Sequence, residues 1–335
     1  MRNVYQKALI FVGIYAICLV GSVSGNSQPT ERSVAASKII VTVMDGRIRS
    51  EPSLRGKILK EAKVGTVLSL VEENSKWHKV ELSPANEAEG TEAEMGWIAK
   101  SISSKFDEAK PDPVFKQIAN NYLGRKKLSL RNTNGLMEFL ESAADNSKTF
   151  ETGGMLRLQR LHALQKALRN IPVGKGDNPP YKSFLEKHKE EVVYSEPAGE
   201  WYVRANNYWE LHARYKKHKV GQDIAWEASN ASLPGECEGY VVCHINKIRV
   251  TSGEYLNFYP NGKHSKQALT DIINLLQPIV ADIPRKTTYY TASDISDRAV
   301  FNKILAELRT IISKTPYIEK QKALVQISQI AEGHR

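Results

Sequence analysis

The chain has 335 residues, of which 41% are hydrophobic, and a formal net charge of +10. A chain of this length has room for more than one hydrophobic core, so a single small domain is excluded. It contains only three cysteines, which excludes a metal site built from two cysteine pairs and leaves one disulfide at most.

The N-terminus has the residue order of a secretory signal peptide. Arg2 and Lys7 flank the start of an apolar run, residues 8–20, which small residues up to Gly25 follow. We expect residues 1–25 to be a signal that is cleaved after Gly25, and residues 26–38 to be a flexible lead-in. The alternative is a retained membrane anchor, although the run is shorter than the ~20 residues of a comfortable span. After signal removal we expect a periplasmic or secreted protein with no stable membrane span.

Residues 39–106 have the alternation of short β-strands. Arg47 and Arg49 flank Ile48, so the isoleucine can face a core while both guanidinium groups face water. Gly65 lies between two hydrophobic runs, where a turn needs positive φ or close backbone approach. The segment therefore predicts a small closed β-barrel.

Two tryptophans lie in the second half of this segment. Alternation places Trp77 and Lys79 on one face of a strand and Val80 on the other. Gly96 lets the chain pass close to another strand, while Trp97 supplies a large packing surface. One face of the predicted barrel is therefore expected to combine aromatic and polar side chains.

This segment resembles a bacterial SH3-like domain, a small barrel often attached to exported cell-envelope proteins. Two positions depart from the family pattern: Glu51 stands where the family prefers glycine, and residues 83–95 form a long acidic insertion. The resemblance implies a barrel that binds cell-wall glycopeptide or an extended protein segment, and we expect Arg49, Trp77 and Trp97 to contact it. The resemblance is carried, in chain order, by Arg47-Ile48-Arg49-Ser50 with Pro52-Ser53, Lys63-Val64-Gly65, Trp77 with Val80, and Gly96-Trp97-Ile98.

A charged, proline-punctuated segment, residues 107–113, predicts a linker after the barrel. Beyond it the apolar period changes from 2 to 3.6, so we expect residues 114–335 to form an all-α domain. Apolar residues recur at helical steps from Leu269 to Val280 and from Phe301 to Ile312, which predicts two amphipathic helices.

Two further helices are predicted from weaker signals. Leucines from Leu158 to Leu168 suggest one helix, flanked on its N-terminal side by Gly153-Gly154. Thr315-Pro316 is typical of a helix start, with a cap residue followed by proline, and predicts a last helix that runs to about Ile330.

A helix-turn-helix join is predicted around residues 253–269. One helix with Tyr255 and Tyr259 ends at a Pro260-Asn261-Gly262 turn, and a second begins near His264. This join resembles those of tetratricopeptide-like repeats in bacterial envelope proteins, over residues 226–278 at most. No period of ~34 residues recurs elsewhere, so we expect an irregular helical array that mediates protein interaction.

Cys237 and Cys243 remain once Cys18 is assigned to the signal. In an exported protein such a pair predicts a disulfide. Six residues of continuous helix would separate the Cα atoms by ~9 Å, beyond the ~7 Å that a disulfide tolerates, so any helix here begins after Cys237. Only His244 is nearby, so no metal site is expected.

An enzymatic alternative rests on the same cysteine. Cys237, with His264 downstream, superficially resembles the nucleophile segment of papain-like cell-wall endopeptidases, which need a free thiolate within reach of an imidazole. Glu238 stands where these enzymes have a small serine, and Cys243 offers a disulfide partner. We therefore expect no catalytic residue. The glycine-rich residues 173–177 lack phosphate-loop spacing, and we expect no cofactor.

Positive charge concentrates in residues 204–219, beside several aromatic residues. Outside the cytoplasm the available polyanions are the wall and its anionic polymers rather than nucleic acid, so we expect attraction to the envelope. An ordinary solvated helix face remains the alternative. Four histidines on predicted helices are expected to be solvated: His162, His188, His212 and His218.

The sequence thus predicts a two-domain exported protein, an SH3-like barrel followed by an α-helical domain, with a non-enzymatic binding or scaffold function. The expected partner is cell-wall glycopeptide or an envelope protein. A third possibility is a purely structural assembly factor whose barrel packs only against its own helices.

Overall fold

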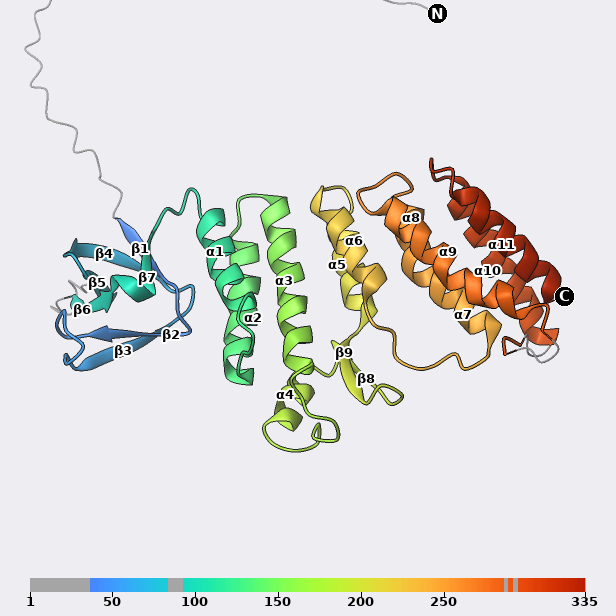
Figure 1. The fold of residues 1–335 in the computed structure, drawn as a ribbon. Helices are drawn as coiled ribbons and strands as arrows, with labels where there is room; N and C mark the ends of the chain where they lie inside the picture. Colours follow the sequence, from blue (N-terminus) through green and yellow to red (C-terminus); the bar gives the residue numbers. More distant parts are fainter. Residues whose placement is uncertain (1–36, 84–92, 286–288, 292–294, 335) are drawn as a thin grey trace, which may run out of the picture. The chain divides into compact units, whose positions relative to one another are not determined.

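The computed structural model describes residues 37–83, 93–285, 289–291 and 295–334 (Figure 1). The predicted signal peptide and its cleavage site, nearly all of the lead-in, and most of the acidic insertion lie outside the described residues. In the part that is described, a seven-stranded sheet precedes a series of helices. The predicted order, a β region followed by an α region, is confirmed.

The sheet is antiparallel throughout, in the strand order β3-β2-β6-β5-β4-β1-β7. Its edges are β3 and β7, and among the described residues no pairing joins these two strands, so the predicted closure of the barrel is not found. The strands are β1 Lys38–Val41, β2 Asp45–Arg49, β3 Ile58–Lys63, β4 Val67–Glu73, β5 Trp77–Ser83, β6 Glu94–Ala99 and β7 Ser103–Phe106.

One face of this sheet packs its apolar side chains into a hydrophobic core. Ile48 and Ile98 are fully buried in it, while Arg47 is exposed and Arg49 is partly exposed, as the alternation predicts. Gly96 is required by this packing, because a Cβ there would lie 2.4 Å from Cγ2 of Ile48. Each buried isoleucine contributes roughly 1.5–3 kcal/mol, so the alternation fixes which face of each strand turns inward.

Beyond residue 107 the chain is mainly helical, and the helices predicted around Leu269–Val280 and Phe301–Ile312 are confirmed as α9 and α10. The helices are α1 Asp112–Leu123, α2 Leu130–Asp145, α3 Phe150–Leu168, α4 Tyr181–Lys187, α5 Ala205–Tyr215, α6 Val220–Asn230, α7 Val241–Ile248, α8 Glu254–Phe258, α9 Ser265–Asp282, α10 Ile295–Ser313 and α11 Lys320–Gly333.

The prediction of an all-α region is wrong in one respect. A two-stranded hairpin, β8 Val192–Ser195 and β9 Glu200–Val203, lies between α4 and α5. Val192 and Val203 pair across it, and both are buried. The hairpin was not predicted because each of its strands has only four residues, too few to give a clear alternating pattern among the helical segments around it.

Two predicted helix boundaries are also wrong. The Gly153-Gly154 pair lies inside α3 rather than flanking it. Glycine is needed at position 154 because a Cβ there would lie 2.8 Å from Cγ1 of Val220, at the contact with α6. At the other end of the chain, α11 begins at Lys320 and not at the Thr315-Pro316 step. The Thr315 hydroxyl instead donates back to the carbonyl of Ile312, at the end of α10.

The predicted helix-turn-helix join is confirmed, with one added feature. Between α7 and α8 the chain forms a π-helical turn, Arg249–Gly253, so the three segments make one continuous helix. Tyr255 of α8 is fully buried, and its hydroxyl accepts a hydrogen bond of 3.1 Å from the backbone N–H of His264. This bond fixes the turn that leads into α9.

The sheet and the first helices share one cluster of buried side chains. Ile40 of β1 and Val64 of the β3–β4 turn pack with residues of α1, α2 and α3. Gly65, at φ +83°, comes so close to α2 that a Cβ would lie 2.5 Å from Cδ2 of Phe139. The predicted linker, residues 107–113, is thus a short connection, with α1 beginning at Asp112, between parts that pack against each other. A second cluster joins α6 to the helices that follow it.

Candidate functional site

The face of the sheet opposite its core brings two of the three predicted ligand-contacting residues together. Arg49 of β2 and Lys79 of β5 are each register partners of Trp97 on β6, which lies between those strands. The Lys79 Nζ atom lies 5.7 Å from the centroid of the Trp97 ring, within the range of a cation–π interaction. We call Arg49, Trp97 and Lys79 the tryptophan strip.

The tryptophan strip is partly open to solvent. The Trp97, Lys79 and Arg49 side chains are all partly exposed. Arg49 is held in place because its Nη1 donates a hydrogen bond of 2.8 Å to the carbonyl of Gly56, in the loop between β2 and β3. The Lys79 ammonium also forms an ion pair with Glu72, with Nζ 3.5 Å from a carboxylate oxygen. The accessible ring therefore has the Arg49 guanidinium on one side and an ion-paired ammonium on the other.

Trp77, the third predicted contact residue, lies two positions before Lys79 on β5 but is only 9% exposed. Its backbone N–H donates to Oδ1 of Asn74 over 2.8 Å, and the Asn74 N–H donates to the Trp77 carbonyl. Trp77 therefore anchors the β4–β5 hairpin and offers a ligand much less surface than Trp97. Both tryptophans follow the same alternation, so the sequence alone did not separate them.

A polar cluster that sequence reasoning missed lies around His78, on the core face of β5. His78 is nearly fully buried, with Nδ1 2.9 Å from the Ser103 hydroxyl and Nε2 3.6 Å from a Glu73 carboxylate oxygen. Glu73 also pairs with Lys100 at 2.7 Å and with Lys105 at 2.6 Å. These bonds tie β4, β5 and β7 together.

The charges in this cluster are fixed by their neighbours. Hydrogen bonds from Lys100 and then Lys105 lower the pKa of Glu73 to about 2, so the carboxylate stays ionised. Burial, followed by the charge of Lys100, lowers the pKa of His78. A neutral, buried imidazole with fixed partners serves to hold strands together rather than to contact a ligand.

A cleft of about 610 Å³ lies beside the sheet, between the β3–β4 turn, the end of β7, and helices α1 and α2. Its apolar side is made of three phenylalanines, Phe106, Phe115 and Phe139, whose neighbouring ring centroids are 5.8 and 6.0 Å apart. Lys63 and Glu138 form an ion pair of 3.4 Å among its lining residues. The cleft thus combines an apolar wall with a charged rim.

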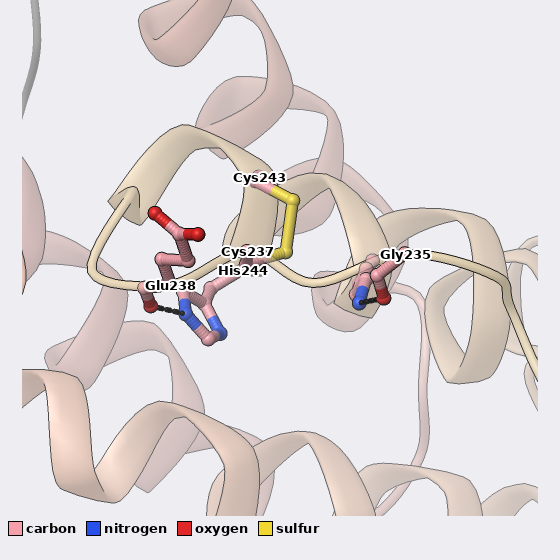
Figure 2. Close-up of a disulfide and its surroundings, with 6 residues drawn as sticks. Gly235, Cys237, Glu238, Cys243 and His244 are labelled. Carbon is pink, nitrogen blue, oxygen red and sulfur yellow. Dashed lines mark hydrogen bonds between the residues drawn. A yellow bond between two sulfur atoms is a disulfide. The ribbon is translucent and has the colours of Figure 1, made fainter. Parts of the chain in front are cut away.

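The disulfide predicted for Cys237 and Cys243 is present in the structure, as Figure 2 shows. The Cα atoms are 5.4 Å apart, because Cys237 precedes α7 and Cys243 lies in its first turn. Glu238 turns the chain at φ +45°, and its carbonyl lies 2.9 Å from Nε2 of His244 (Figure 2). The helix begins after Cys237, as the spacing requires.

The disulfide bears directly on the endopeptidase alternative. While the bond is intact, Cys237 has no thiolate, which that chemistry needs as its nucleophile. The imidazole of His264 stacks on Trp226 with centroids 4.7 Å apart, and its Nε2 lies 3.6 Å from Asp223. Both contacts belong to α6 and the turn before α9, so the geometry assembles no nucleophile and base.

The prediction that four helical histidines are solvated is wrong for two of them. His212 is only 1% exposed, and His188 is also buried, with Nδ1 2.9 Å from Glu191. His162 is partly exposed and lies 3.1 Å from Glu227, while His218 is partly exposed beside the ring of Phe150. Neighbouring charged residues suggest a polar face, but α5, which contains His212, packs against both α3 and α6, and His188 lies at the end of α4.

No protein-family model matches this chain, and no curated protein or solved structure matches it either. Among the helices of the described residues, none is both long and apolar enough to cross a membrane. Within the same described ranges, no group of three or more histidine, cysteine, aspartate or glutamate side chains is arranged to hold a metal ion.

Proposed function

We propose that this protein is a non-enzymatic binding protein of the bacterial cell envelope, exported by its N-terminal signal. In this proposal the sheet is an SH3-like module that binds cell-wall peptide, and the tetratricopeptide-like helices hold a protein partner. The observation that carries the proposal is the tryptophan strip, an accessible aromatic ring between two cations on the side of the sheet away from its core.

The chemistry of the strip fits an extended, negatively charged peptide. Trp97 offers a flat apolar surface for a peptide chain or a sugar ring, and aromatic residues of this kind contribute most of the affinity at many interfaces. Arg49 supplies positive charge on one side of it, complementary to a peptide carboxylate, and Lys79 supplies an ammonium on the other side that is already paired with Glu72. The net charge of +10 adds long-range attraction to anionic wall polymers.

The test is retention of the purified chain, from residue 26 onward, on isolated cell-wall material at low salt. We expect Trp97→Ala to weaken retention by about tenfold, since truncation of a central aromatic contact commonly costs over ~1 kcal/mol. Leu54→Ala is the matched control, because Leu54 is a highly exposed apolar residue in the loop between β2 and β3, outside the strip. Equal retention of Trp97→Ala and Leu54→Ala would overturn the proposal.

A further inference from the structure

A second cavity, of about 490 Å³, lies among the helices and takes no part in the proposed function. Its walls come from the end of α1, one side of α3, and parts of α5 and α6. Most of its lining residues are polar or charged, with Leu123 and Ala231 as apolar exceptions. Its titratable lining residues are His162, Lys166, Arg169, Tyr208 and Glu227.

Tyr208 is the most informative of these residues. It is only 6% exposed, and in the part of the chain that the structure describes its hydroxyl has no hydrogen-bond partner, although the side chain lines the cavity. The hydroxyl oxygen is not among the enclosed unpaired atoms of the described residues, so it is accessible from the cavity and can donate a hydrogen bond to a group bound there. Burial, and then the charge of Glu227, raises the pKa of Tyr208, so the hydroxyl keeps its proton as a donor.

Three of the lining side chains already have partners within the protein: His162, Lys166 and Glu227. Nε2 of His162 lies 3.1 Å from Glu227, and this hydrogen bond is the main cause that lowers the pKa of the Glu227 carboxyl. Lys166 donates to the carbonyl of Leu123, the last residue of α1, and to that of Arg125 just beyond it. The Glu227 carboxylate is thus occupied by His162, and the Lys166 ammonium by backbone carbonyls.

Arg169 is the remaining cation. It follows the last residue of α3, is exposed, and within the described ranges forms no ion pair. A guanidinium group can bind the two oxygens of a carboxylate or phosphate at once. Tyr208 and Arg169 therefore provide one neutral and one charged donor at the same cavity.

We propose that this cavity binds a small molecule through a carboxylate or phosphate group, with Tyr208 and Arg169 as its hydrogen-bond donors. The His162–Glu227 pair forms another wall of the site and disfavours a second negative group near it. The site is separate from the tryptophan strip, and the inference does not rest on wall binding.

Isothermal titration calorimetry at low salt tests this with three probes: inorganic phosphate, N-acetylalanine as the carboxylate, and N-acetylalanine amide as the neutral control. We expect one or both anions to bind and the amide not to bind, and the anion that binds identifies the group. Tyr208→Phe and Arg169→Gln are each expected to weaken binding by about tenfold, since a lost hydrogen bond to a charged group has that order of effect.

Two variants are matched controls. Tyr202→Phe removes a tyrosine hydroxyl on β9, and Arg204→Gln removes an exposed charge just before α5; neither residue lines the cavity. Both should bind within twofold of the unmodified chain. No binding of either anion, equal binding of the amide, or unchanged affinity in Arg169→Gln would overturn the inference. Arg169 is exposed, so its variant tests the site even if Tyr208→Phe unfolds.

Discussion

The buried His212 makes folding stability depend on pH in a direction that the structure fixes. Burial, and then the charge of Lys216, lowers its pKa from 6.5 to about 4, and its Nε2 lies 2.9 Å from the Tyr259 hydroxyl. In the unfolded chain the imidazole takes up a proton below about pH 6.5. Between these two values the unfolded state binds more protons, so the free energy of unfolding falls as the pH falls.

The size of this effect follows from the two pKa values. Each pH unit between them is worth about 1.4 kcal/mol, so His212 accounts for a loss of about 2 kcal/mol between pH 7 and pH 5. His212→Gln removes the titrating group and keeps an amide that can reach Tyr259. We expect this variant to lose about 2 kcal/mol less than the unmodified chain over that interval, whatever its stability at pH 7.

Urea unfolding followed by circular dichroism at pH 7 and pH 5 measures the difference. His218→Gln is the control, since His218 lies only six residues after His212 but its side chain is partly exposed. It should follow the unmodified chain. The reasoning is refuted if His212→Gln loses as much stability between pH 7 and pH 5 as the unmodified chain does.

Two other predictions concern stability. Replacing both Cys237 and Cys243 by serine should lower the free energy of unfolding by about 2 kcal/mol, the contribution expected for a loop of this length; unchanged urea midpoints with and without reductant would contradict it. Gly65→Ala should cost clearly more than Gly174→Ala, for which about 1 kcal/mol is expected, although both glycines have positive φ. Only at Gly65 would the new Cβ meet a neighbour, Phe139, at 2.5 Å, and equal losses in urea unfolding would show that the sheet does not pack there.

The sequence predicted β2 and β6 well because buried and exposed residues alternate in them, whereas β4 is irregular and its pairing with β5 shifts register between Leu70 and Glu72. Ile48 is the only large apolar residue on the inward face of β2, and Ile98 is the only one on the inward face of β6. Gly96 leaves the space that the Ile48 side chain occupies. The alternation does not say whether the end strands meet, and it did not reveal that β3 and β7 remain edges. Closure depends on strand twist and on packing with α1 and α2, which no local pattern contains.

The candidate sites were predicted less completely. Arg49 and Trp97 were both singled out, yet their adjacency depends on strand order, because β2 pairs with β6 although three strands, β3, β4 and β5, lie between them in the sequence. Trp77 and Trp97 could not be separated without burial. Tyr208 lies in α5 and Arg169 lies 39 residues earlier, just after α3, and no spacing rule links them. Hydrophobic periodicity indicates local secondary structure, and it does not show which elements far apart in the sequence come into contact.

The most direct measurement of the proposed function is nuclear magnetic resonance of the tryptophan indole N–H groups during titration with soluble cell-wall peptides. The chain has five tryptophans, so each indole signal can be assigned by substitution. The tryptophan strip predicts a saturable shift of the Trp97 signal, with the signals of Trp209 and Trp226 unchanged. No shift of Trp97 at saturating peptide, or shifts only among the helical tryptophans, would contradict the account.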